Sequence, residues 1–124
     1  MQVLLSIKPE FVEKIFNGEK KFEYRKSIFT NKEVKTVLIY ATMPVGRVVG
    51  QFEIEKILED SPNNIWDETR NYSGINKDFY DEYFKGKNKA YAIKIKSYKI
   101  FDTPKNLYQC IKRDHPPQSF CYIA

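Results

Sequence analysis

Three ionisable residues, Lys20, Glu23 and Arg25, stand close together in the stretch NGEKKFEYR, which covers residues 17–25. A lysine can hold a phosphate group as a point charge, or act as a base where burial lowers its pKa. Glu23 and Arg25 lie two residues apart, so on a β-strand their side chains point to the same face. There a carboxylate can accept hydrogen bonds from the edge of a base, and a guanidinium can bind phosphate. The stretch therefore fits the floor of a binding cleft, or a solvated surface pair contributing less than about 1 kcal/mol.

The residues around this stretch predict the elements that must position it. Residues 1–7 have the apolar pattern of a short strand, and residues 9–18 predict a helix that begins at a proline and ends at a glycine. After this glycine the period changes to two, with Phe22 and Tyr24 alternating with charged residues. This is the pattern of a half-buried strand, so Lys20 is expected at the turn that joins the helix to that strand.

The rest of the chain alternates between apolar segments and short helical patterns. The predicted elements are, in order, strands over residues 36–42 and 47–58, two short helices between residues 61 and 86, a strand over residues 89–98, and a last strand and closing segment over residues 101–124. Gly50, inside one of these strands, predicts a bulge or tight bend. The pattern therefore predicts one α+β domain over residues 1–124, a small barrel of five or six mainly antiparallel strands with an early helix and a short helical insertion.

Composition limits the classes of function. The 124 residues carry a net charge of +5, which favours a polyanionic partner. Two late cysteines, Cys110 and Cys121, do not form a disulfide framework, and their redox state stays open. With His115 as the single histidine, no metal and no other cofactor are expected. No apolar run approaches the roughly 18 residues of a membrane span, and no signal peptide is recognisable, so a cytoplasmic location without a membrane partner is expected.

The motif and its surroundings resemble a known family. Gly18, Lys20, Glu23 and Arg25 spell G-x-K-x-x-E-x-R, which resembles the signature of the ASCH domain, a member of the PUA-like superfamily. Four stretches resemble the family's opening strand–helix–motif unit, central hairpin, late strand and the closing segment of small bacterial and phage members: LLSIKPEFVEKIFNGEKKFEYR, YATMPVGRVVGQFEI, YFKGKNKAYAIKI and PPQSFCYI. The resemblance implies a PUA-like β-barrel with a cleft lined by the motif. It also implies binding of RNA or a nucleotide-like ligand, in connection with transcription or translation.

Two other functions stay open. Some small family members resemble amidohydrolases acting on acetylated cytidine nucleosides such as N4-acetylcytidine, and another branch is associated with ribonuclease activity. The amidohydrolase-like members have a threonine where this chain has Glu23, and they need a further carboxylate, for which Asp67 and Glu68 are candidates. Lys20 and Glu23 are then candidate catalytic residues that activate a water molecule. The third interpretation is a protein-interaction module whose basic face meets an acidic protein partner.

Five further residues are candidates for lining the same cleft. Lys8 ends the first strand near the motif, Tyr40 and Thr42 end the strand over residues 36–42, and Arg47 follows the next turn. Trp66, in the helical insertion, either stacks on a base or seals its helix against the sheet. Lysines in the C-terminal half predict a solvated edge, or a phosphate track that continues the cleft.

Overall fold

A six-stranded sheet organises the chain in the computed structural model, which describes residues 1–123. The helices and strands are, in chain order, β1 (Gln2–Ile7), α1 (Pro9–Phe16), β2 (Phe22–Arg25), β3 (Thr36–Ala41), β4 (Arg47–Asp60), α2 (Pro62–Thr69), the 3-10 helix η1 (Arg70–Tyr72), α3 (Lys77–Tyr83), β5 (Ala90–Lys105), α4 (Leu107–Ile111) and β6 (Phe120–Ile123). Ala124, which belongs to the predicted closing segment, lies outside the described residues.

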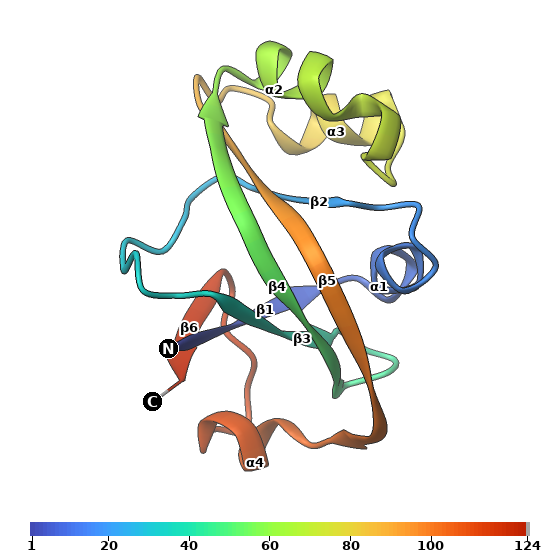
Figure 1. Ribbon diagram of the computed structural model, residues 1–124, viewed down its shortest axis with the longest axis vertical. Helices are drawn as coiled ribbons and strands as arrows, with labels where there is room; N and C mark the ends of the chain where they lie inside the picture. Colours follow the sequence, from blue (N-terminus) through green and yellow to red (C-terminus); the bar gives the residue numbers. More distant parts are fainter. Residues whose placement is uncertain (124) are drawn as a thin grey trace.

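The sheet is mixed and strongly twisted, with the strand order β2-β5-β4-β3-β1-β6 (Figure 1). β1 and β3 run parallel, whereas the other neighbouring pairs within residues 1–123 are antiparallel. The α+β class and the mainly antiparallel pairing are thus as predicted. The sheet is not closed into a barrel, because β2 and β6 stand at opposite ends of the strand order. Each has four residues and pairs along one side only, so no backbone ladder joins the two edges.

The long β4–β5 ribbon bends where the sequence predicts it. Gly50 pairs with Ile39, and the register between β3 and β4 shifts directly beside this pair, which confirms the bulge. A Cβ atom on Gly50 would overlap the carbonyl oxygen of Lys99 and lie 2.6 Å from Cζ of Phe16. Only glycine lets the ribbon and the end of α1 approach this closely.

Two predictions for the C-terminal part are wrong. β5 continues to Lys105, beyond the predicted residue 98, although Pro104 lies within it. Proline is tolerated there because it lies within the register shift between the Ile100 and Lys105 pairings with β4. The short helix α4 was not predicted, since five residues are too few for a helical period. Its signal is the capping box formed by Asn106 and Gln109.

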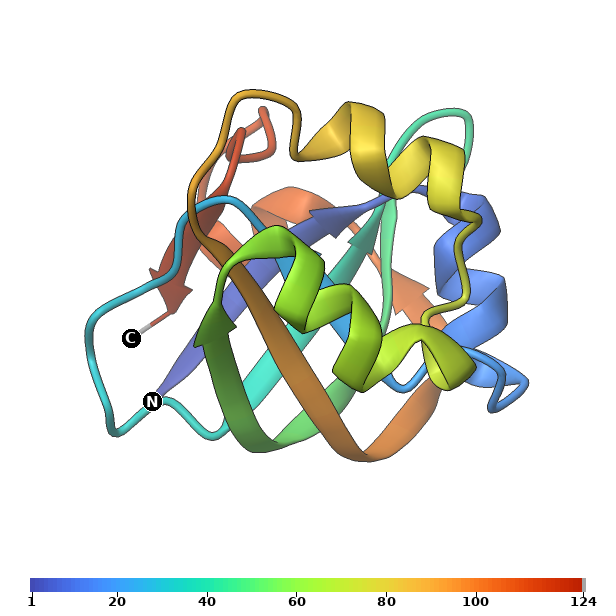
Figure 2. The same ribbon diagram turned by 90° about the horizontal axis from the view of Figure 1, so that it is seen from above.

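Three apolar clusters hold the helices to the sheet. α1 buries Val12 and Ile15 against the main cluster, and α4 covers a second cluster at the far end. Above β2, α2 and α3 close a third cluster, in which Tyr80 and Phe84 pack on Tyr24. Figure 2, which looks down on this end, shows α2 and α3 over the sheet and α1 beside them. Within residues 1–123, no helix has the length and apolar character needed to cross a membrane.

The close approach at Gly50 makes Gly50→Ala a test of the packing between β4, β5 and α1. The added methyl group meets backbone at Lys99, which cannot rotate away. We expect a loss of about 1–3 kcal/mol in the free energy of unfolding, measured by urea denaturation. A variant as stable as the wild type would show that the ribbon is not constrained at this position.

Candidate functional site

The turn after α1 carries Lys20 back towards the helix. Gly18 adopts the left-handed conformation (φ 85°) that commonly ends a helix. The N–H of Lys20 then donates to the carbonyl oxygen of Lys14 at 3.0 Å, and that of Lys21 to Tyr72 at 2.9 Å. These bonds fix the start of β2 between α1 and η1. The side chain of Lys20 is thereby directed under α1 rather than into solvent.

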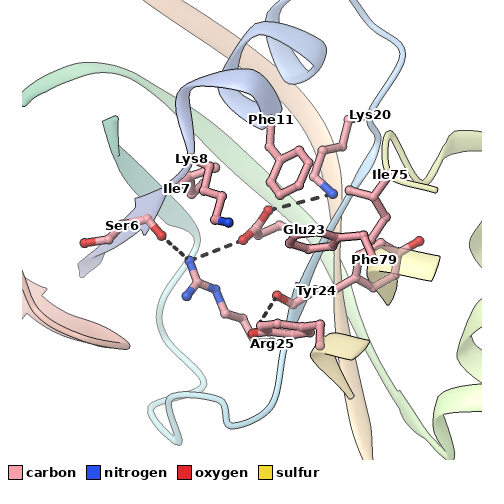
Figure 3. Close-up of a pocket in the computed structure, with 11 residues that line it drawn as sticks. Ser6, Ile7, Lys8, Phe11, Lys20, Glu23, Tyr24, Arg25, Ile75 and Phe79 are labelled. Carbon is pink, nitrogen blue, oxygen red and sulfur yellow. Dashed lines mark hydrogen bonds and ion pairs between the residues drawn. The ribbon is translucent and has the colours of Figure 1, made fainter. Parts of the chain in front are cut away.

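Lys20, Glu23 and Arg25 meet at the floor of a cavity, with Glu23 between the two cations (Figure 3). Oε1 of Glu23 lies 3.9 Å from Nζ of Lys20, and Oε2 lies 3.2 Å from Nη2 of Arg25. The three residues are only 2%, 7% and 9% exposed. They form a buried ionic triad rather than the solvated pair that the sequence left open.

A backbone carbonyl group accepts a hydrogen bond from each of the two cations. Nζ of Lys20 donates to the carbonyl oxygen of Ser73 at 2.9 Å, and Nη2 of Arg25 donates to that of Ser6 at 2.8 Å. Nε of Arg25 is buried and has no hydrogen-bond partner among residues 1–123. A buried donor without a partner is costly, and a ligand or water molecule that reaches it would remove that cost.

The cavity above the triad has a volume of about 220 Å³ and largely aromatic walls. Phe11 comes from α1 and Tyr24 from β2, whereas Phe79 and Tyr83 come from α3 with their rings nearly parallel. The complete lining is Ser6, Ile7, Lys8, Phe11, Lys20, Glu23, Tyr24, Arg25, Ile75, Phe79 and Tyr83. Flat aromatic walls over a charged floor suit a planar polar ring.

Burial lowers the pKa of Lys20 from 10.5 to about 8, although the charge of Glu23 opposes this shift. The charges of Arg25 and Lys14 lower it further. The ammonium group also lies 4.7 Å from the ring centre of Tyr24 and 5.4 Å from that of Phe11. Lys20 is therefore mainly protonated at neutral pH, but it can release its proton far more readily than a surface lysine.

Tyr24 is held in place by a buried hydroxyl chain. Oγ1 of Thr69 donates to the carbonyl oxygen of Ile65 at 2.6 Å, so the hydroxyl of Tyr24, 2.7 Å away, donates to Thr69. Burial raises the pKa of Tyr24 to about 12, which keeps this donor protonated at neutral pH. Through this chain, α2 fixes the ring on which Lys20 rests.

Four of the predicted cleft residues line this cavity, and four do not. Lys8, Lys20, Glu23 and Arg25 are brought together. Tyr40 is buried in the cluster beneath α4, because alternation along β3 turns its side chain to the other face of the sheet. Thr42 and Arg47 lie at the β3–β4 turn, outside the cavity lining, and Arg47 bonds to the carbonyl oxygen of Gly46.

In the helical insertion, Trp66 has the sealing role that was one of its two predicted alternatives, and it does not have the base-stacking role. Trp66 packs on Tyr80, with ring centres 4.8 Å apart, and does not line the cavity. Asp67 and Glu68 are exposed on α2 and are also absent from the lining. Within residues 1–123, no group of three or more His, Cys, Asp or Glu side chains is arranged to hold a metal ion.

Sequence reasoning missed the aromatic wall from α3. Of the four aromatic residues Phe79, Tyr80, Tyr83 and Phe84, only Tyr80 and Phe84 are buried in the core. Phe79 and Tyr83 each precede one of these core residues by one position, so they lie on the neighbouring face of the helix, which lines the cavity. The available signal was the pair of i, i+4 aromatic repeats one residue apart, since a short helix cannot bury two such stripes in one core.

Together, the fold and the site define a small α+β domain with a buried cation–carboxylate–cation floor beneath aromatic walls. Comparisons with known proteins give this class a name. Residues 5–99 match the profile of the ASCH domain. The chain belongs to the ASCH domain family.

Relatives match nearly the whole chain. A protein from Zymomonas mobilis named "ASCH domain-containing ribonuclease" is 30% identical over 98% of this chain and 84% of its own length. The large ribosomal subunit protein uL22 of Ureaplasma parvum serovar 3 is 31% identical over 98% of this chain. This chain spans only 39% of the length of that ribosomal protein. The crystal structure of ASCH from Zymomonas mobilis superposes with a TM-score of 0.90 at 28% identity, covering 99% of this chain and 87% of that one.

Gly74 is expected to position Lys20. Its φ of 68° is left-handed, and an added Cβ would overlap Cβ of Lys20 and lie 2.7 Å from its Cγ. Gly86 is a matched control, because its φ is 77° but an added Cβ would have no neighbour within 4 Å. Both alanine variants bear the left-handed cost of about 1–2 kcal/mol. Gly74→Ala should lose a further 1–3 kcal/mol or so in urea denaturation; equal losses would contradict the positioning role.

The lowered pKa of Lys20 predicts a pH dependence of stability. Between about pH 8 and pH 10.5 the unfolded chain binds more protons at this residue than the folded chain, so stability rises with pH. The contribution is up to about 3 kcal/mol, and it is lost as the pH falls through 8. Chemical denaturation across this range should show a smaller rise in Lys20→Met than in the wild type. Parallel curves for the two proteins would refute a lowered pKa at Lys20.

Proposed function

We propose that the chain is a single ASCH domain that binds RNA, with one unpaired base inserted into the cavity over Lys20, Glu23 and Arg25. The observation that carries the proposal is the convergence of these three side chains at the floor of an aromatic-walled cavity. Sequence-specific recognition of RNA commonly uses unstacked bases held against aromatic side chains and read along their edges. A cavity of about 220 Å³ suits a single base better than a whole nucleotide.

Each floor residue has a distinct role in this proposal. Glu23 accepts hydrogen bonds from amino or imino groups on the edge of the base, since an ionised carboxylate is an acceptor only. Lys20 and Arg25, which also line the floor, donate to its carbonyl oxygens or ring nitrogens. Phe79 and Tyr83 offer the stacking surface, at roughly 1–3 kcal/mol for a base on an aromatic ring.

The Zymomonas relative supports an RNA ligand, because it is named a ribonuclease and this chain covers 84% of its length. The name of the ribosomal relative has less weight, since the match covers only 39% of that protein. The net charge of +5 is in keeping with a polyanionic partner. We further propose that this RNA binding serves regulation linked to transcription or translation.

RNA cleavage is a second candidate, favoured by the lowered pKa of Lys20. In neutral form, Lys20 would take the proton of a ribose 2′-hydroxyl as its oxygen attacks the adjacent phosphorus. The bond from phosphorus to the 5′-oxygen of the next nucleotide would break, and this oxygen would take a proton from water. The rate of cleavage should then rise with pH towards about 8, where Lys20 loses its proton.

Release of acetate from N4-acetylcytidine tests the amidohydrolase alternative, in which Lys20 and Glu23 activate water.

Glu23→Gln tests the reading of the base edge. The substitution keeps the shape of the side chain but replaces one acceptor oxygen by a donor, so bases bound through Glu23 lose affinity by roughly 1–3 kcal/mol. We expect the differences in affinity among the four homopolymeric RNAs to shrink, as measured by fluorescence anisotropy. Glu53→Gln is the control, since Glu53 accepts from Thr36 on the sheet away from the cavity, and this variant has the same change in net charge.

The two variants separate specific from general effects. Unchanged preferences in Glu23→Gln, with its folding verified by its thermal transition, would exclude the floor as the base-reading site. Equal effects of the two substitutions would assign RNA binding to net charge alone. No binding of any RNA by the wild-type protein would overturn the proposal and leave a small nucleoside or an acidic protein as the ligand.

A further inference from the structure

Two exposed lysines lie against the aromatic wall of the cavity, Lys8 within its lining and Lys26 beside it, over the ring of Tyr83; we call this region the mouth. Nζ of Lys8 lies 5.0 Å from the ring centre of Phe79, and Nζ of Lys26 lies 4.5 Å from that of Tyr83. These two rings are stacked neighbours on α3, with centres 6.5 Å apart and planes 11° from parallel. The two ammonium groups thus stand over adjacent rings of the wall that lines the cavity.

The two lysines come from different elements that end at the same place. Lys8 directly follows β1 and precedes α1, and Lys26 directly follows β2. In Figure 3 the Lys8 ammonium group points in the direction of Glu23 and Arg25. Both lysines are exposed, unlike the cations of the floor. Among residues 1–123, neither forms an ion pair with a carboxylate, so both charges are available to a ligand.

The charges of the floor and the mouth differ in kind. On the floor, Glu23 already compensates much of the charge of Lys20 and Arg25. The mouth has two uncompensated positive charges, and no carboxylate other than Glu23 lines the cavity. A neutral ring on the floor with anionic groups at the mouth would match this distribution. A nucleotide inside a nucleic acid strand has that arrangement, with a neutral base and a phosphate on each side.

We propose that Lys8 and Lys26 form a phosphate bracket that holds the backbone on either side of the inserted base. The inference rests on the proposed function and makes the substrate class narrower: a nucleotide within a single strand, not a free nucleoside. The aromatic rings have two uses here. They line the cavity that takes the base, and they hold the lysines in place by cation–π attraction of about 0.5–1 kcal/mol each at exposed sites.

The bracket has a measurable electrostatic signature. Each phosphate neutralised on a single strand contributes about 0.7 to the slope of log affinity against log salt concentration. Loss of both lysines should therefore reduce the magnitude of this slope by roughly 1.4. Affinity for an uncharged nucleoside should not change, because it has no phosphate for the bracket to hold. A merely structural pair of lysines would alter thermal stability without altering the slope.

The experiment compares Lys8→Ala/Lys26→Ala with Lys105→Ala/Lys112→Ala. The control lysines also lie over aromatic rings, Phe101 and Tyr108, at 5.1 Å and 5.7 Å. They flank α4, at the other end of the molecule from α3 (Figure 1). The net-charge change and the number of lost cation–π contacts are therefore equal in the two double variants. The probe is a labelled single-stranded RNA pool, titrated between about 50 and 200 mM salt.

The bracket predicts weaker RNA binding and a reduced salt slope in the Lys8/Lys26 variant, with the control close to wild type. Equal slopes in the two double variants would overturn the bracket. Binding that depends on Glu23 but not on Lys8 and Lys26 would overturn the bracket alone and leave the proposed function in place. Wild-type protein that binds no RNA would instead overturn the proposed function, and the bracket with it.

Discussion

The site depends on one buried carboxylate. Glu23 lies between Lys20 and Arg25, and without it two cations would be buried side by side in a protein interior. Burial of charges costs several kcal/mol per ion unless partners and hydrogen bonds compensate. Two segments distant in the sequence supply further partners: the carbonyl oxygen of Ser73 accepts from Lys20, and that of Ser6 accepts from Arg25. The end of β1, the turn at Gly74 and the segment after η1 are therefore parts of one electrostatic arrangement, and removal of any partner should weaken the others.

The arrangement also separates two kinds of positive charge. The cations of the floor are rigid, desolvated and partly neutralised, so they are suited to directional hydrogen bonds with a neutral ring. Lys8 and Lys26 at the mouth are solvated and rest on Phe79 and Tyr83, so they are suited to attract a backbone without reading its sequence. Because α3 supplies both rings, its packing on β2 through Tyr80 connects the stability of the domain to the shape of the proposed binding site.

The positions of the three floor residues could be predicted from the periodicity of the sequence. Alternation in NGEKKFEYR places Glu23 and Arg25 on one face, and the glycine after α1 places Lys20 at the turn, as the structure has them. The sequence does not reveal which distant backbone atoms meet these side chains. It also gave no means of telling the two faces of β3 apart, so Tyr40 was assigned to the cleft although it lies in the core under α4. The prediction of a closed barrel was wrong for a similar reason, because the pattern of a strand does not define which other strand its edge pairs with.

The central claim is that RNA binds in the cavity above the triad. Its most direct test is to titrate the protein with a single-stranded RNA pool and to follow the NMR chemical shifts of the protein's backbone amides. We expect the shifted amides to cluster around the cavity: residues 6–8 at the end of β1, residues 20–26 along the motif strand, and residues 73–83 from the Ser73 loop to the end of α3. Shifts confined to the lysine-rich outer part of β5, or to α4, would contradict it. RNA would then be bound by surface charge, and the buried triad would serve the fold alone.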